Sequence, residues 1–235
     1  MRILCIVQER PTSPDSSALT LQVEDGLSVS GLLELPAAAR ACFVLAHGAG
    51  AGMRHRSMAA VAQGLAARGI ASLRYQFPYM EQGKRRPDPP PLCHATVRAA
   101  VAQAARRMPG LKLVAGGRSF GGRMTSQAQA LEPLAGVRGL AFLSFPLHPA
   151  GAPADTRAAH LARVSIPMLF LSGTRDALAE RALLEAAVAR LGARATLSLI
   201  ADANHSFHVP ARSGRGDAEV LEEALERLAA WIDTL

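Results

Sequence analysis

The chain has 235 residues, of which 49% are hydrophobic and 19% are charged. These proportions exclude global disorder and supply enough apolar side chains for a substantial core, in one large domain or two small ones. No apolar run approaches the roughly 20 residues that a membrane-spanning helix needs. The apolar stretch after Arg2 is shorter than the core of a secretory signal peptide, so we expect a cytoplasmic protein with no membrane partner.

The formal net charge is +7 and is carried mostly by arginine. Basic residues are scattered along the chain, apart from the cluster Lys84-Arg85-Arg86, and this distribution favours solvated helix faces over a nucleic-acid partner. The cysteines Cys5, Cys42 and Cys93 are odd in number and widely spaced, which predicts free thiols.

The first elements are predicted from composition and alternation. Residues 1–18 are interpreted as a flexible N-terminal extension, because prolines and serines are frequent from residue 8 onward. Apolar and polar residues then alternate on both sides of Asp25-Gly26, a pattern typical of a β-hairpin. Residues 41–46 are apolar without interruption, as in a strand buried on both faces. We expect residues 19–235 to form a single domain.

Strand and helix patterns alternate over the rest of the chain. Strands are predicted at 70–73, 111–115, 139–145, 168–172 and 195–200, and helices at 57–68, 92–107, 120–130, 180–191 and from about 217 onward. A hairpin followed by repeated strand–helix units predicts an α/β fold, in which a mostly parallel twisted sheet carries an N-terminal antiparallel hairpin and has helices on both faces. The connection 146–166 is too short for a substantial cap domain.

The run Gly117-Arg118-Ser119-Phe120-Gly121 lies between a predicted strand and a predicted helix. In this context a G-x-S-x-G pattern indicates a sharp turn that exposes a nucleophilic serine. The residues two before and two after the serine must be small, because the backbone turns too tightly for a Cβ there. The helix start also favours negative charge that develops beside Ser119.

A serine hydroxyl becomes nucleophilic when a base accepts its proton and an acid orients that base. Asp176 and His205 each follow a predicted strand, and the carboxyl ends of parallel strands meet at one edge of a sheet. The chain order Ser119, Asp176, His205 is the order found in α/β-hydrolases. Asp202 and His208 are the alternatives for acid and base, and we prefer Asp176 and His205.

The segment His47-Gly48-Ala49-Gly50 follows the buried strand 41–46. Its glycines let the backbone approach a substrate, so we expect the N–H of Ala49 to complete an oxyanion hole with the N–H of Phe120. His47 and Gly48 then become candidates for the pocket lining. The alternative is a plain turn.

Three further groups are candidates for the substrate pocket because they follow predicted strands. Tyr75 and Tyr79 belong to a segment that leads to Lys84-Arg85-Arg86, where basic side chains would attract an anionic substrate unless the segment is a solvated loop. His148 either reaches the rim of the pocket or only holds its own loop in place.

The chain resembles α/β-hydrolases of the dienelactone-hydrolase-like group. It is more similar still to the branch that includes testis-expressed protein 30 and the α/β-hydrolase-like subunit of a chromatin acetyltransferase complex. The resemblance spans about residues 20–235, and its matching segments are His47–Gly50, Arg74–Glu81, Gly116–Arg123, Phe145–Pro149, Gly173–Asp176 and His205–Phe207. It implies an α/β-hydrolase fold. Dienelactone hydrolases proper carry a cysteine nucleophile where this chain has Ser119, so their substrate does not carry over.

These observations predict a serine hydrolase of the esterase or thioesterase class that acts on a small soluble acyl substrate without a metal or organic cofactor. The alternative is a hydrolase scaffold that serves as a protein-interaction module, since fold does not imply function.

Overall fold

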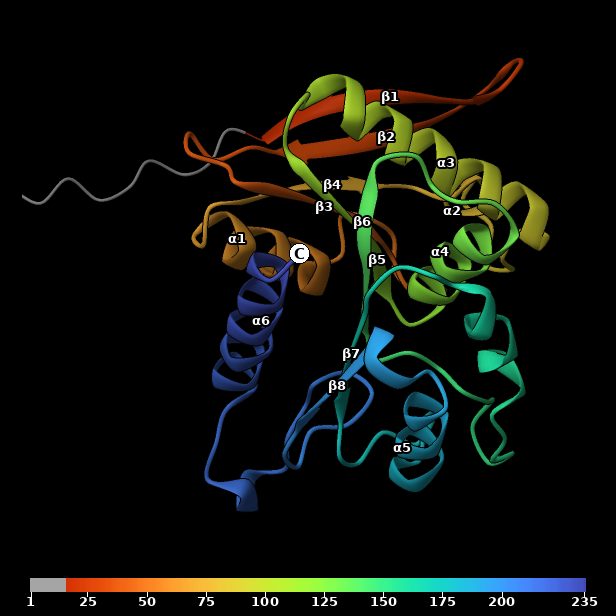
Figure 1. Ribbon diagram of the computed structural model, residues 1–235. Coiled ribbons are helices and arrows are strands. Elements are labelled where there is room, and N and C mark those ends of the chain that lie inside the picture. The colour runs from red at the N-terminus through yellow and green to blue at the C-terminus, as the bar shows by residue number, and fades with distance from the viewer. Residues whose placement is uncertain (1–15) are drawn as a thin grey trace, which may run out of the picture.

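The computed structural model describes residues 16–235, so the first fifteen residues of the predicted extension lie outside the described residues. The described chain forms one sheet of eight strands in the order β1-β2-β4-β3-β5-β6-β7-β8 (Figure 1). The strands are β1 (Ser16–Glu24), β2 (Leu27–Glu34), β3 (Ala41–Ala46), β4 (Ile70–Tyr75), β5 (Lys112–Arg118), β6 (Val137–Leu143), β7 (Met168–Gly173) and β8 (Ala195–Ile200).

The sheet is mostly parallel. β2 pairs antiparallel with β1 and with β4, and every other pairing is parallel. The helices that connect or follow the strands are α1 (Arg56–Ala66), α2 (Pro78–Glu81), α3 (Pro90–Arg107), α4 (Phe120–Leu131), α5 (Arg181–Ala189) and α6 (Asp217–Asp233). Short 3₁₀ helices are η1 (Thr156–Arg163), η2 (Gly192–Arg194) and η3 (Ala211–Ser213).

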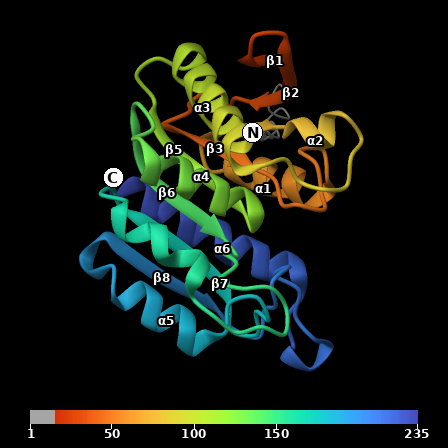
Figure 2. The same ribbon diagram turned by 90° about the vertical axis from the view of Figure 1, so that its right-hand side faces the viewer.

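Helices cover both faces of the sheet, as the sequence predicts. α1 and α6 lie on one face, while α3, α4 and α5 lie on the other (Figures 1 and 2). Two hydrophobic clusters follow this division. The smaller joins α1 and α6 to strand residues such as Phe43 and Leu169, and the larger joins α3, α4 and α5 to residues such as Phe142 and Phe170. The central strands are therefore buried on both sides.

The predicted hairpin, the strand order along the chain and the five long helices are confirmed, and two predicted strands have the observed bounds. β1 begins at Ser16, three residues before the predicted hairpin. β4 and β5 both extend further than predicted, to Tyr75 and Arg118. α2 and η1 were not predicted, because segments this short carry too little periodicity. The connection between β6 and β7 contains only η1, which leaves the site without a cap domain.

Within residues 16–235, no helix combines the length and the apolar character required to cross a lipid bilayer.

Candidate active site

Ser119 lies at a strained turn between β5 and α4. Its φ is 49° and its ψ is −114°, a conformation that residues with a side chain rarely adopt. A Cβ at Gly117 would lie 2.2 Å from the carbonyl oxygen of Ala46, and one at Gly121 would lie 2.5 Å from that of His47. Glycine is therefore required on both sides of Ser119, as the sequence predicts.

Ser119, His205 and Asp176 form one hydrogen-bonded chain. The Oγ of Ser119 donates to Nε2 of His205 at 2.8 Å. Nδ1 of His205 donates to the carboxylate of Asp176, with both oxygens at 2.9 Å. Since Nδ1 carries the proton, Nε2 is free to accept one from the serine. The structure thus brings together the three residues that the sequence singles out.

The carboxylate of Asp176 is fixed from several directions. Its side chain is fully buried, and it also accepts the N–H of Leu178 at 2.8 Å and the hydroxyl of Ser172 at 3.5 Å. The side chain of His205 is 22% exposed. A buried, oriented acid behind a partly open imidazole is the arrangement that general-base chemistry needs.

Asp202 and His208 lie apart from this chain. Asp202 is exposed in a turn, where its N–H donates to Thr174. His208 is exposed and pairs with Asp217 at 2.9 Å, and its hydrogen bond is the main reason why the pKa of Asp217 is lowered. Neither residue contacts Ser119, so the preferred residues are the ones that the structure assembles.

Arg118 and Asn204 hold the His205 loop in place, and neither was predicted to have a role. The guanidinium of Arg118 donates to the carbonyl of His205 at 3.3 Å. Burial lowers the pKa of Arg118. The side chain of Asn204 accepts the N–H groups of Ser206 and His208. Arg118 lies inside the G-x-S-x-G run, which is the only signal that pointed to it.

The loop after β3 lies against Ser119, as predicted for the second half of an oxyanion hole. A Cβ at Gly48 would lie 4.0 Å from that of Ser119, and Ala49 and Phe120 line the same cavity. Within residues 16–235, neither the Ala49 N–H nor the Phe120 N–H donates to a protein acceptor. Both groups are therefore available to a ligand.

His47, Tyr75 and Tyr79 differ from their prediction as pocket residues, because none has exposed surface. The ring of His47 donates from Nδ1 to the carbonyl of Gly48 and accepts the N–H of Phe77 at Nε2. Burial lowers the pKa of His47 to about 4, so the ring is neutral. The hydroxyl of Tyr79 donates to the carbonyl of Ala49 at 2.8 Å. These side chains support the loop from behind.

Aromatic packing explains why this support is rigid. Phe77 packs edge-on against His47 and Phe120, and Tyr79 also packs against Phe120. Tyr75 is fully buried beside Phe77, and its hydroxyl has no hydrogen-bond partner among residues 16–235. Tyr75 is the last residue of β4, two residues beyond the predicted strand end, which is why it faces the core.

His148 is also buried, at 1% exposure. Its Nδ1 donates to the carbonyl of Pro149, and its backbone N–H donates to Leu178 beside the Asp176 turn. Of the two predicted roles, the structure shows the one in which His148 holds its own loop.

Ser119 opens into a cavity of about 430 Å³. The rest of its lining comes from the loop after β3, the segment before α3, helix α4 and the connections after β6 and β7, and comprises Ala49, Pro87, Asp88, Pro90, Phe120, Arg123, Met124, Pro146, Arg157 and Leu178. Apolar and charged side chains thus share a cavity of the size that small ligands use.

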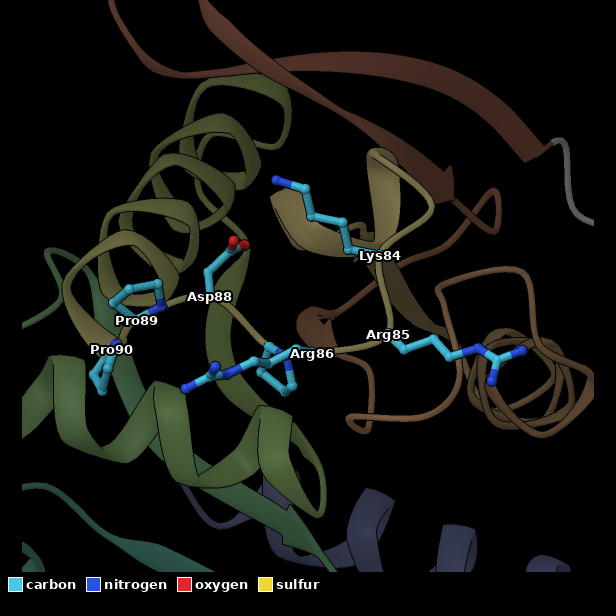
Figure 3. A pocket seen from close by; sticks show the side chains of 7 residues that line it. Lys84, Arg85, Arg86, Asp88, Pro89 and Pro90 are labelled. Carbon is cyan, nitrogen blue, oxygen red and sulfur yellow. The ribbon is translucent and has the colours of Figure 1, made fainter.

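A second depression, of about 740 Å³, adjoins this cavity and contains the basic cluster. It is lined by residues 84–90 and shares Pro87, Asp88 and Pro90 with the cavity of Ser119. Figure 3 shows that Arg86 points to the side of Pro89 and Pro90, whereas Arg85 points away from them. The cluster is exposed beside the site and does not contact Ser119.

Solved structures share this architecture over nearly the whole chain. A dienelactone hydrolase from Anabaena variabilis is 22% identical, with a TM-score of 0.78 over 95% of this chain and 99% of that one. A serine hydrolase without a lid from Xanthomonas campestris is 20% identical, with a TM-score of 0.70 over 94% and 98%. Est1E from Butyrivibrio proteoclasticus, solved with ferulic acid, is 16% identical, with a TM-score of 0.70 over 92% and 100%. At sequence identities this low, the structural similarity establishes the fold and nothing about the substrate.

A family model described as "Alpha/beta hydrolase domain" matches residues 39–233. The match contains Ser119, Asp176 and His205 and leaves out only the hairpin strands β1 and β2 from the sheet. The strand order, the turn at Ser119 and this match agree, and the chain belongs to the alpha/beta hydrolase family.

Proposed function

We propose that the protein is a serine hydrolase that cleaves esters or thioesters through an acyl-enzyme on Ser119. The observation that carries this proposal is the continuous hydrogen-bonded chain from Ser119 through His205 to Asp176 at a strained turn. Strain at this position favours a functional role for Ser119, because a positive φ at serine raises the conformational energy of the backbone and persists only where the surrounding structure holds it.

In the first step, Oγ of Ser119 attacks the acyl carbonyl carbon while its proton moves to Nε2 of His205. Asp176 stabilises the imidazolium that forms and keeps it oriented, without accepting a proton itself. The carbonyl oxygen gains negative charge and faces the N–H groups of Phe120 and Ala49. Donors that are already aimed at this oxygen stabilise the tetrahedral intermediate without reorganisation.

The intermediate then collapses, and the bond from carbon to the alcohol or thiol breaks. The leaving group takes the proton from His205. A water molecule next attacks the acyl-enzyme, gives its proton to His205 and releases the acid, and the proton returns to Ser119. The cycle consumes one water for each ester and requires no oxidant, reductant or metal.

Within the family, we also propose that the chain belongs to the branch that includes testis-expressed protein 30. The support lies in segments specific to that branch. Pro78–Glu81 forms α2, whose Glu81 carboxylate accepts the hydroxyl of Ser30 at 2.6 Å and ties the helix to β2. Tyr79 of the same helix holds the carbonyl of Ala49.

The test is the hydrolysis of p-nitrophenyl acetate by wild-type protein and by Ser119→Ala. Removing the nucleophile should lower kcat at least about 1,000-fold, because catalysis by the remaining groups is small. Ser206→Ala is the matched control, since this exposed serine lies beside His205 outside the hydrogen-bonded chain, and it should retain activity. Equal activity in Ser119→Ala and wild type would refute the assignment.

Labelling by a fluorophosphonate probe gives a second measurement that needs no substrate. Only an activated serine reacts, so the label should appear on Ser119 and disappear in Ser119→Ala. A protein that folds yet fails to label would favour the interaction-module alternative.

A further inference from the structure

Two arginines line the cavity of Ser119 from separate elements. Arg123 lies on α4 and Arg157 lies on η1, and both side chains are partly buried. Neither has a role in the proposed hydrolysis. Guanidinium groups inside an active-site cavity need an explanation, because removing a charge from water is costly unless a partner compensates.

The protein supplies no ion-pair partner for either guanidinium within residues 16–235. None of the ten ion pairs in this part of the chain includes Arg123 or Arg157. Nε of Arg123 is buried without a hydrogen-bond acceptor in the described part of the chain. Asp88 is the one acid in the lining, and its carboxylate accepts the N–H of Tyr79 at 2.7 Å. The hydrogen-bonding capacity of the two guanidiniums is thus left open.

The neighbourhood of Arg123 is positively charged. Burial lowers the pKa of Arg123, and repulsion from Arg157 lowers it further. The pKa of His160, whose Nε2 meets the hydroxyl of Ser126, falls to about 4 through burial and then through the charges of Arg123 and Arg163. Like charges that lie close together are stabilised when an anion binds between them.

The position of Arg123 relates this charge to the reaction. Arg123 follows Ser119 by one helical turn, and its N–H donates to the carbonyl of Ser119 at 3.1 Å. Helical side chains lean toward the N-terminus of their helix, which directs Arg123 back toward the nucleophile. Its guanidinium carbon lies 5.8 Å from the ring centre of Phe120, whose N–H faces the reacting carbonyl. A bound anion therefore lies a few atoms from the scissile bond.

We propose that Arg123 and Arg157 bind a carboxylate carried by the substrate, so that the enzyme prefers half-esters or half-thioesters of short dicarboxylic acids. This inference rests on the proposed hydrolase function. Two arginines and Asp88 leave one net positive charge in the lining, which matches a carboxylate better than a dianionic phosphate. The planar fork of arginine also fits the two oxygens of a carboxylate.

The test compares mono-p-nitrophenyl glutarate with its methyl ester, which has the same acyl chain without the charge. Wild type should hydrolyse the charged ester with a kcat/KM at least about 10-fold higher, mainly through a lower KM, as expected for one charge-assisted contact. Arg123→Gln and Arg157→Gln should each remove this preference, so that the kcat/KM values for the two esters become nearly equal within each variant. Arg123→Lys retains the charge and should retain part of the preference.

Arg107→Gln is the matched control, because it removes the same charge from an exposed site at the far end of α3. It should leave the preference intact. A second pair of substrates, 4-acetoxybenzoate and its methyl ester, carries the carboxylate on the leaving group. A preference limited to this pair would overturn the dicarboxylate assignment and place the anion on the other side of the scissile bond.

Binding to Ser119→Ala separates a failure of this inference from a failure of the hydrolase proposal. Calorimetry should show that monomethyl glutarate binds at least about 10-fold more tightly than dimethyl glutarate, and that adding Arg123→Gln abolishes the difference. Equal binding of the two esters overturns the carboxylate site even where p-nitrophenyl acetate is cleaved. If Ser119→Ala binds the charged ester selectively but wild type cleaves no ester, the carboxylate site is supported and the hydrolase proposal is refuted.

Discussion

Two regions beside the cavity of Ser119 differ in whether their polar groups have hydrogen-bond or ion-pair partners within the protein. In the oxyanion region, residues 47–52 and 77–81, both ring nitrogens of His47 and the hydroxyl of Tyr79 are bonded within the protein. In the arginine region, formed by Arg123, Arg157 and His160, Nε of Arg123 has no partner and neither arginine joins an ion pair within the described chain.

This contrast distinguishes groups that any substrate of the reaction would need from groups that favour one class of substrate. An oxyanion hole works because its donors are fixed before charge develops, so its supporting groups must be satisfied internally. A side chain contributes to ligand affinity only where its hydrogen-bonding capacity is not already used within the protein. The first region is therefore expected to control kcat, and the second to control KM for charged substrates.

The largest effect should come from breaking the catalytic chain while both regions stay intact. Asp176→Asn should lower kcat by roughly 1,000- to 10,000-fold, because an amide no longer holds His205 in the tautomer that accepts the proton of Ser119. Steady-state kinetics on both glutarate esters measures this. The preference for the charged ester should survive, since Arg123 and Arg157 do not touch Asp176.

Asp202→Asn is the control for this change. This substitution also replaces an aspartate by asparagine, but the carboxylate of Asp202 is exposed and lies outside the hydrogen-bonded chain. Its kcat should equal that of wild type. A loss of similar size in both variants would show that the acid has been misassigned.

A histidine in each region, the buried His47 and the half-buried His160, predicts a pH dependence of stability. The pKa values of His47 and His160 are lowered from the ordinary 6.5 to about 4. Between these values the unfolded chain binds protons that the folded chain excludes, so stability falls as pH drops through this window. From pH 7 to pH 5 the free energy of unfolding should decrease by about 2 kcal/mol through the buried His47 and by less through His160, whose partly exposed ring is screened by solvent; urea denaturation measures both.

The causes of the two shifts differ, and this difference tests the comparison directly. Burial alone lowers the pKa of His47, whereas Arg123 contributes to the shift at His160. In Arg123→Gln, NMR titration of the imidazole signals should show a higher pKa for His160 and an unchanged one for His47. A shift of both would mean that the two regions are not electrostatically separate, and a shift of neither would mean that the charge of Arg123 does not act on His160.

The proposed catalytic residues were accessible from the sequence because each depends on local patterns. Residues 41–46 and 195–200 have the predicted strand bounds, and strand ends locate loops such as the one with His205. The turn at Ser119 has an additional signature in Gly117 and Gly121. Asp176 was preferred to Asp202 because Asp202 lies only three residues before His205.

The substrate-facing residues were not accessible in the same way. Tyr75 was placed in the pocket because the predicted strand ended at residue 73, and two more residues of β4 carry it into the core. Arg123 reads as a solvated helix residue, and Arg157 lies in a connection without periodicity. Which side chains meet in a cavity depends on packing between distant elements, which a hydrophobic pattern does not encode.

The smallest effect should come from loosening the oxyanion region by one hydrogen bond. Tyr79→Phe removes the donor to the carbonyl of Ala49, a contact expected to contribute about 1 kcal/mol. Since the N–H of Ala49 is proposed to face the oxyanion, kcat should fall about 3- to 10-fold with little change in KM. Tyr75→Phe is the matched control, because that hydroxyl is buried without a partner in the described part of the chain. If Tyr79→Phe instead raised KM for the charged ester alone, the division of labour between the two regions would fail.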